Sequence, residues 1–326
     1  MKTKIALCQL NPLSGKPEVN YQKIEKVLKD YSREKIALFI FPEDFLHGIL
    51  RGHNEILEAG NHFRVWVKKF SSLAKKYNVD LIPGSFPVLR NDKLFNTTIY
   101  IDKKGRILNE YSKTNLWLSE RDEYSSNTIP PQCFHSVLGK TAQIICWDIM
   151  NHKLFEEVVK QGAEWIINIS LWSTNQTRDL AKRRGKTKNK YDILVRKSER
   201  LDSIIETRST EYNIGMIFCN IGGIHNYIAL DKKNQQARSA GRTQIITPLN
   251  GIKKIVSSRK EQIFICKIPD IKSYLSDHEI LYGRREDIQN DCPPNMVIAS
   301  LSTSDVENVE NAIKGTIISP RLGYSV

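Results

Sequence analysis

The order of apolar and amphipathic segments in the first half of the chain constrains the fold more than any other feature. Ile36–Phe41 is an unbroken apolar run that ends at Pro42, as expected of a strand buried on both faces of a sheet. It follows a predicted strand at Ile5–Leu10 and a predicted helix at Glu18–Tyr31. The apolar residues of that helix fall roughly on one face: Val19, Ile24, Val27 and Leu28. Helices that alternate with apolar strands predict an α/β protein in layers.

The rest of the chain continues this pattern and then becomes richer in strands. Two further helices are predicted at Phe63–Tyr77 and Leu154–Gln161. Strands or β-rich stretches are predicted at Val79–Phe86, Leu94–Tyr111, Thr141–Cys146, Glu164–Ser170, Ile214–Asn220, Thr243–Thr247 and Gln262–Ile268. The β-rich regions 94–137 and 214–268 favour two packed sheets over one doubly wound sheet. Because no repeat or glycine-rich linker divides the chain, a single domain over residues 1–288 is expected, followed by a C-terminal tail at 289–326.

Positive charge is concentrated in one segment. The chain has a net charge of +13, and residues 178–200 supply +7 of it, with ten basic and three acidic side chains. We expect residues 173–200 to form a basic insertion between two strands. Two interpretations stay open, a patch that attracts anionic substrates or a solvated loop. A nucleic-acid-binding protein is disfavoured, because the segment lacks interleaved aromatic residues apart from Tyr191 and no known binding module is present.

Cysteine usage and hydropathy address the cellular compartment. Six cysteines in 326 residues, without a Cys-x-x-Cys pair, do not suggest a disulfide framework or a zinc site. The first ten residues lack the apolar core and small-residue cleavage site of a signal peptide, and no 18-residue apolar run exists in the chain. We therefore expect reduced thiols and a cytoplasmic protein that does not enter a membrane.

Three ionisable residues stand where predicted apolar strands end. Glu43 follows Phe39–Pro42, Lys113 follows a strand ending at Tyr111, and Cys146 ends another strand. The ends of strands in layered α/β proteins face the ligand site, so these side chains are expected to converge. A carboxylate can take the thiol proton, the thiolate can attack an electrophilic carbon, and the ammonium can stabilise the resulting negative charge. Backbone N–H groups and Lys113 are expected to lower the pKa of Cys146.

Each of these residues also has an ordinary structural interpretation. A cysteine that ends an apolar strand is most often a small buried hydrophobe, as expected for Cys8, Cys219 and Cys266. Glu43 alone is compatible with a helix cap, and Lys113 alone with a solvated loop. The joint pattern favours catalysis over these alternatives.

The local sequence around these residues resembles the nitrilase, or carbon–nitrogen hydrolase, superfamily. The resemblance runs in family order over about residues 1–288. It rests on the motifs Ile5-Ala-Leu-Cys-Gln-Leu-Asn-Pro12, Phe41-Pro-Glu-Asp-Phe45, Tyr111-Ser-Lys-Thr-Asn-Leu116, Cys146-Trp-Asp148, Gln161-Gly-Ala163, Asn168-Ile-Ser-Leu-Trp172, Arg208-Ser-Thr-Glu211, Cys219-Asn220, Ser239-Ala-Gly-Arg-Thr-Gln-Ile245 and Tyr282-Gly-Arg-Arg285.

The resemblance implies a four-layer α-β-β-α sandwich that forms homo-oligomers and uses neither a metal nor an organic cofactor. It implies that Glu43 is the general base, that Lys113 stabilises the intermediate and that Cys146 is the nucleophile. Glu120 is the preferred second glutamate, with Glu123 as the alternative. The tail at 289–326 is expected either to pack on a partner subunit or to be a loose end.

The family hydrolyses nonpeptide C–N bonds in amides, nitriles or carbamoyl compounds through a thioester. Many nitrilases carry Cys-Trp-Glu where this chain has Asp148, which favours a small-molecule amide. The resemblance makes the backbone N–H of Trp147 the second oxyanion donor. Trp117, Trp147 and Trp172 are interpreted either as substrate-binding residues or as core. A catalytically inactive scaffold with the same fold is the remaining alternative.

Overall fold

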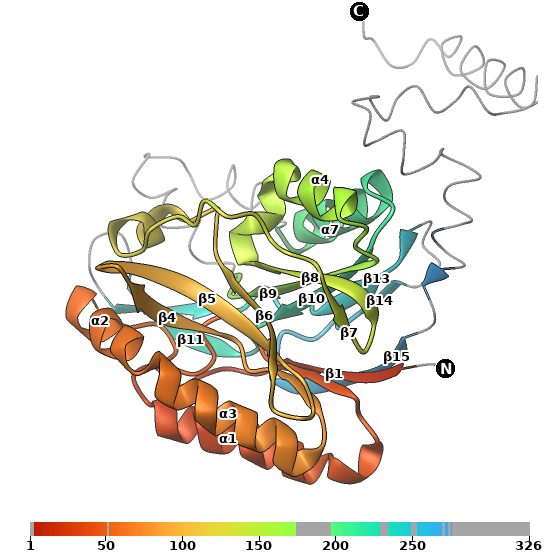
Figure 1. Ribbon diagram of the computed structural model, residues 1–326. Coiled ribbons are helices and arrows are strands. Elements are labelled where there is room, and N and C mark those ends of the chain that lie inside the picture. The colour runs from red at the N-terminus through yellow and green to blue at the C-terminus, as the bar shows by residue number, and fades with distance from the viewer. Residues whose placement is uncertain are drawn as a thin grey trace, which may run out of the picture.

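Two β-sheets pack against each other in the computed structural model, and helices cover the outer face of each sheet (Figure 1). The structure describes residues 3–50, 52–173, 197–228, 234–248 and 253–268, together with 271, 272 and 275. The two packed sheets between two helical layers confirm the predicted four-layer α-β-β-α sandwich. Most of the predicted basic insertion and the whole predicted tail lie outside the described residues.

The first sheet has the strand order β15-β1-β2-β3-β5-β4, with β6 paired to β5. Its parallel strands β1, β2 and β3 adjoin an antiparallel meander of β4, β5 and β6. The last strand, β15, lies antiparallel beside β1, so the far end of the domain closes the first sheet. The bounds are β1 (Thr3–Gln9), β2 (Leu38–Ile40), β3 (Asp80–Ile82), β4 (Ser85–Arg90), β5 (Lys93–Ile101), β6 (Ile107–Ser112) and β15 (Gln262–Ile268).

The second sheet has the order β14-β13-β10-β9-β8-β7, and its centre is the parallel set β8, β9 and β10. A separate two-stranded ribbon is formed by β11 and β12. The bounds are β7 (Phe134–Ser136), β8 (Gly139–Ile145), β9 (Trp165–Ser170), β10 (Gly215–Asn220), β11 (Ile224–Ile228), β12 (Asn234–Arg238), β13 (Gln244–Ile246) and β14 (Lys253–Ile255).

The helices form the two outer layers. α1 (Pro17–Asp30) and α3 (Phe63–Tyr77) cover the first sheet, while α4 (His152–Lys160) and α7 (Lys197–Glu211) cover the second (Figure 1). α2 (His53–Asn61) packs beside β4. Short 3-10 turns follow α1, β6 and β8: η1 (Ser32–Glu34), η2 (Leu118–Asp122) and η3 (Cys146–Met150).

The alternation of side chains along a strand divides the core. In β1, Ile5 and Leu7 join the apolar cluster that includes the second sheet, whereas Ala6 and Cys8 join the cluster under α1 and α3. Successive side chains of a strand point to opposite faces, so a strand between two apolar layers must be apolar throughout. This explains why the first strands read as continuous apolar runs.

Most of the predicted elements are present, with three differences. In α1, Ile24, Val27 and Leu28 are buried as predicted, but Val19 is 45% exposed. It precedes Ile24 by five residues, a rotation of about 140° around a helix, and therefore leaves the buried stripe. α2 and α7 were not predicted, and β7, β11, β12 and β14 were predicted only as parts of the β-rich regions 94–137 and 214–268. α7 begins at Lys197, so the last residues assigned to the basic insertion belong to a helix.

Candidate active site

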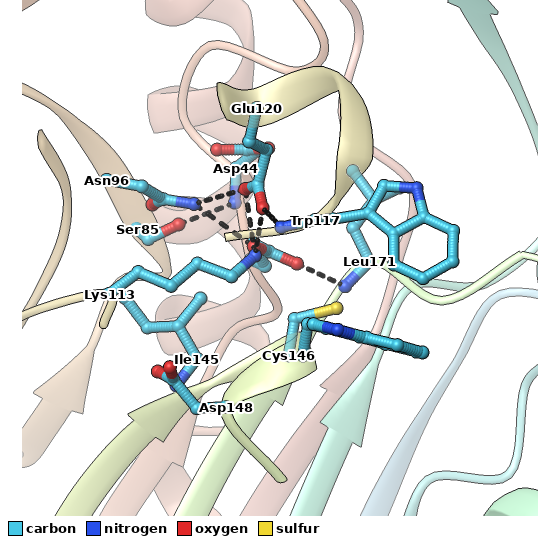
Figure 2. Close-up of polar contacts among 12 residues, drawn as sticks. Asp44, Ser85, Asn96, Lys113, Trp117, Glu120, Ile145, Cys146, Asp148 and Leu171 are labelled. Carbon is cyan, nitrogen blue, oxygen red and sulfur yellow. Dashed lines mark hydrogen bonds and ion pairs between the residues drawn. The ribbon is translucent and has the colours of Figure 1, made fainter. Parts of the chain in front are cut away.

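The three predicted catalytic residues lie together where strands of the two sheets end. Glu43 follows β2 and Lys113 follows β6 in the first sheet, while Cys146 follows β8 in the second. All three are buried, with exposed fractions of 2%, 1% and 8%. In Figure 2, the hydrogen bonds of Lys113 and Asn96 meet near Glu120, with the Cys146 sulfur and the Leu171 N–H beside them. The packing of the two sheets therefore assembles the site.

The Lys113 ammonium stands between two carboxylates. Its Nζ donates a hydrogen bond of 2.7 Å to Oε1 of Glu43 and lies 2.8 Å from the Glu120 carboxylate. Asn96 links the same two carboxylates, donating from Nδ2 over 3.0 Å to Glu43 and 3.3 Å to Glu120. The backbone N–H of Trp117 donates to Glu120 over 2.6 Å, which fixes that carboxylate from the other side. Every charge at the centre of the site is thus held by a partner.

The choice between the two candidate glutamates is clear from their positions. Glu120 contacts Lys113, whereas Glu123 lies 3.2 Å from the ring of the exposed residue His53. The structure therefore places Glu120 in the candidate site and Glu123 outside it.

The pKa values of Glu43 and Lys113 are both raised, but for different reasons. Burial raises the pKa of Glu43, and the Lys113 ammonium opposes this shift only in part. Burial would lower the pKa of Lys113, but the Glu120 and Glu43 carboxylates more than offset it, so that pKa lies well above its ordinary value. Lys113 thus remains an ammonium, and Glu43 binds a proton more readily than a solvated glutamate does.

Cys146 has an unusual backbone conformation and a thiol with a raised pKa. It begins η3 with a φ of 47°, in the left-handed region that non-glycine residues rarely adopt. Burial, and next the Glu43 carboxylate, raise the pKa of the thiol well above its usual value, against the lowering effect of Lys113. The expectation of a lowered pKa was therefore wrong. Desolvation dominates, and Cys146 needs a base to become a nucleophile.

Asp148 connects the turn that begins at Cys146 to the loop that follows Lys113. Its carboxylate accepts hydrogen bonds from the Tyr111 hydroxyl and from the backbone N–H groups of Ile145, Thr114 and Asn115, over 2.6–3.2 Å. Burial raises the pKa of Asp148 to about 6. The motif comparison singled out Asp148 only as a shortened acid, because its hydrogen-bond role depends on contacts across two loops.

Trp117, Trp147 and Trp172 pack against one another beside the candidate nucleophile Cys146. The ring centroids of Trp117 and Trp147 lie 4.2 Å apart, and those of Trp147 and Trp172 lie 5.2 Å apart. All three residues are only partly buried. The structure thus brings the predicted residues Trp147 and Trp172 together next to Cys146, and it adds Trp117 to them. Within the described ranges, no group of three or more His, Cys, Asp or Glu side chains is arranged to hold a metal ion.

Comparison with known proteins identifies the family. The family model described as carbon–nitrogen hydrolase matches residues 4–269. The chain belongs to the carbon–nitrogen hydrolase family. This confirms the resemblance read from the motifs.

Curated relatives of this family member are named as amidases, nitrilases and hydrolases. A 2-oxoglutaramate amidase of Bacillus subtilis is 30% identical over 175 residues, which are 53% of this chain and 66% of the relative. A hydrolase in the agr operon of Staphylococcus aureus is 27% identical over 173 residues, covering 52% and 66%. A probable nitrilase of Schizosaccharomyces pombe is 25% identical over 273 residues, covering 81% and 87%. The matches to the first two thus leave about a third of each relative uncovered.

Solved structures show the same fold. Nit3 of Saccharomyces cerevisiae, a member of branch 10 of the nitrilase superfamily, superposes with a TM-score of 0.64 at 19% identity and covers 85% of this chain and 93% of its own. A mutant of the Nesterenkonia amidase gives 0.66 at 17% identity, covering 89% and 96%. At this identity the likeness supports the nitrilase fold alone. In the described part of the chain, no helix is long and apolar enough to span a bilayer.

Proposed function

We propose that this hydrolase converts a small-molecule amide to a carboxylic acid and ammonia through a thioester on Cys146. The observation that carries the proposal is the buried Lys113 ammonium, held between Glu43 and Glu120 beside a thiol at the end of β8. An acid, an amine and a thiol in this order supply a base, an electrostatic stabiliser and a nucleophile.

In the first half of the reaction, Glu43 takes the thiol proton while Sγ of Cys146 attacks the amide carbon. The negative charge that develops on the carbonyl oxygen is stabilised by the Lys113 ammonium and by the backbone N–H of Trp147. When the intermediate collapses, the C–N bond breaks and the Glu43 carboxylic acid returns the proton to the leaving nitrogen. Ammonia leaves, and a thioester remains on Cys146.

In the second half, Glu43 takes a proton from water as the water oxygen attacks the thioester carbon. The C–S bond then breaks, and the sulfur takes that proton back from Glu43. The carboxylic acid is released and the thiol is restored. The raised pKa of Glu43 suits this cycle, because the same group must accept and return a proton in each half.

The relatives support an amide substrate and a cysteine nucleophile. Two of them are named 2-oxoglutaramate amidase and omega-amidase. In a glutamine mutant of the Nesterenkonia amidase, the acetamide moiety of fluoroacetamide is attached covalently to the active-site cysteine. We also propose that Trp147 and Trp172 contact the substrate, since both residues are partly exposed, their rings pack against each other and Trp147 directly follows Cys146.

We further propose that the protein works as a homo-oligomer in the cytoplasm, with the tail at 289–326 packing on a partner subunit. The family resemblance supports the assembly, and light scattering of the full chain tests it. Cys8, Cys146, Cys219 and Cys266 are free thiols, which suits a reducing compartment that protects the Cys146 thiol.

The test is ammonia release from a panel of amides, nitriles and carbamoyl compounds by the wild-type protein and by Cys146→Ala. Cys133→Ala is the matched control, because Cys133 is a half-buried thiol that contacts the Val158 carbonyl oxygen away from the site. We expect release from amides by the wild type and the control alone. Acid formed only from nitriles or only from carbamoyl compounds would replace the amidase proposal. No release from any compound by either protein would indicate an inactive scaffold.

A further inference from the structure

A buried asparagine holds the backbone of the candidate nucleophile. Asn168, in the centre of β9, is fully buried. Its Oδ1 accepts a hydrogen bond of 2.8 Å from the Cys146 N–H, and its Nδ2 donates one of 3.2 Å to the Cys146 carbonyl oxygen. One side chain therefore satisfies both backbone groups of Cys146 at the point where its φ turns positive.

The same arrangement occurs one strand further along the second sheet. Asn220, the last residue of β10, accepts from the Trp172 N–H over 2.8 Å and donates to the Trp172 carbonyl oxygen over 3.1 Å. The registers match as well. Asn168 lies opposite Ile144 and holds the residue two positions later, and Asn220 lies opposite Ser170 and does the same. An asparagine of β9 thus holds the backbone of a residue just after β8. In the same way, an asparagine of β10 holds the backbone of a residue just after β9.

The second asparagine acts on the opposite side of the candidate site. The Leu171 N–H donates a hydrogen bond of 2.8 Å to Oε2 of Glu43. The Trp172 N–H lies in the peptide that directly follows Leu171, so the bonds of Asn220 to Trp172 fix the chain one peptide beyond the N–H that points at the carboxylate. Asn220 also donates over 2.8 Å to the Gly241 carbonyl oxygen, which ties the arrangement to the loop before β13.

We propose that Asn168 and Asn220 are a pair of positioning residues for the hydrolysis, one for the nucleophile and one for the general base. The inference rests on the proposed function, since it assigns these roles to Cys146 and Glu43. It has a chemical consequence for the oxyanion. Because the Cys146 N–H already donates to Asn168, the developing charge is left to Lys113 and the Trp147 N–H.

The first test compares Asn168→Ala with Asn168→Asp. Alanine removes both hydrogen bonds, and a misplaced nucleophile lowers kcat by about 100-fold with little change in KM. An aspartic acid that carries its proton has one donor and one acceptor, as an amide does in this position. We therefore expect the activity of Asn168→Asp, relative to wild type, to rise as the pH falls. A purely structural asparagine would change the melting temperature without this pH dependence.

The second test uses the pH profile of Asn220→Ala. A hydrogen bond to the charged form of a carboxylate lowers its pKa, so loosening the Leu171 N–H raises the pKa of Glu43. The acid limb of kcat/KM is expected to move to higher pH in Asn220→Ala and to stay in place in Asn168→Ala. Identical limbs in wild type and Asn220→Ala would overturn the role assigned to Asn220.

The matched control is Asn20→Ala in α1. Asn20 is also fully buried, and it also holds both backbone groups of one residue, the N–H and carbonyl oxygen of Leu13, over 2.8 Å each. We expect this variant to lose stability but to keep the wild-type kcat. An equal loss of kcat in Asn20→Ala, or an unchanged kcat in Asn168→Ala, would overturn the proposal.

A readout without substrate separates this proposal from the proposed function. The rate at which iodoacetamide alkylates Cys146 is followed by peptide mapping in wild type, Asn168→Ala and Asn20→Ala. We expect a slower reaction in Asn168→Ala alone, because its thiol is displaced from Glu43. That result, in a wild-type protein that hydrolyses no amide, would support the asparagine and contradict the amidase. Equal rates in all three proteins would contradict the role of Asn168.

Discussion

At the scale of single residues, Lys113 is the charge on which the site depends. Its ammonium is the counter-ion of both the fully buried Glu43 and the partly buried Glu120. Removing one partner of a buried ion pair leaves an uncompensated charge. Lys113 therefore contributes to the stability of the fold as well as to the proposed reaction.

We expect Lys113→Met to abolish hydrolysis and to lower the free energy of unfolding by about 3–5 kcal/mol, because two carboxylates lose their counter-ion. Chemical denaturation and ammonia release measure the two effects. Lys68→Met, at an exposed position of α3, is the control and should change neither. A stable Lys113→Met protein would show that the carboxylates do not need the ammonium.

The pH dependence expected of the proposed reaction follows from the raised pKa of Glu43. Glu43 must be ionised to accept the thiol proton, and burial raises its pKa above about 4.3, the value of a solvated glutamate. Activity is present above that raised pKa and is lost as the pH falls through it. The acid limb of kcat/KM should therefore lie above the range of an ordinary glutamate.

The thiol gives an independent check of the same profile. Because the pKa of Cys146 is also raised, alkylation of the protein at pH 7 should be slower than that of free cysteine. Glu43→Gln removes the proposed base and should abolish turnover over the whole pH range. A Cys146 that alkylates faster than free cysteine would contradict the order of charges described for the site.

At the scale of elements, Asp148 joins two segments that are distant in sequence. One is the loop after β6, which carries Lys113, and the other is η3, which carries Cys146. All four groups that bond the Asp148 carboxylate point donors at it. Both outer atoms of the side chain at position 148 must therefore be hydrogen-bond acceptors.

Asp148→Asn places an amide nitrogen where one of those donors points. We expect a loss of about 1–3 kcal/mol in the free energy of unfolding, the cost of leaving a buried donor without an acceptor. Turnover should fall as well, because Lys113 and Cys146 lose their common support. Urea denaturation and kcat are the measurements, with Asp92→Asn in the exposed turn between β4 and β5 as the control. Wild-type stability in Asp148→Asn would refute the role of this carboxylate.

Elements with a strong hydrophobic period were the ones that the sequence could predict. α3 and β15 match their predicted bounds, since four buried residues line one face of α3 and all seven residues of β15 pair with β1. α2 was missed because it contains Gly60 and only a short apolar stripe. β12 was not predicted as a separate strand because its sequence, Asn234–Arg238, is mostly polar.

The candidate site divides in a similar way. Glu43, Lys113 and Cys146 could be predicted because each stands at the end of a predicted strand and within a motif of the family resemblance. Asn96, Asn168 and Asn220 could not, since their roles depend on which residue lies opposite them across a sheet or loop. The signals that the sequence offered were a polar residue inside an apolar run, Asn168 in Ile-Ile-Asn-Ile, and the presence of Asn168 and Asn220 in motifs of the family resemblance.

At the scale of the whole molecule, the site exists only when the two sheets pack. The proposed base and the ammonium come from the first sheet and the proposed nucleophile from the second, and the apolar cluster between the sheets contains side chains of both. The molecule also carries a net charge of +13, more than half of it in residues 178–200. That segment follows Trp172 closely in sequence, and its two interpretations, a patch that attracts anionic substrates or a solvated loop, predict different effects of salt on turnover.

We expect the charge to favour anionic amides. A field of one sign raises encounter rates with opposite charges by about 10-fold or more, and salt screens it over a Debye length of about 10 Å at 0.1 M. The kcat/KM for a monoamide of a dicarboxylic acid should therefore fall severalfold between low and high salt, whereas that for butyramide should not change. Replacing Lys186, Lys188 and Lys190 by Gln should weaken this salt dependence.

The control removes the same charge from the helical layer that covers the first sheet. Lys26→Gln and Lys29→Gln in α1, with Lys68→Gln in α3, lower the net charge equally on the face that covers the first sheet. If total charge were responsible, both triple variants would lose the same salt dependence. If residues 178–200 act on substrate approach, only their variant loses it while both keep the rate on butyramide. Equal rates for all three proteins on the anionic amide at low salt would make the segment a solvated loop without a part in catalysis.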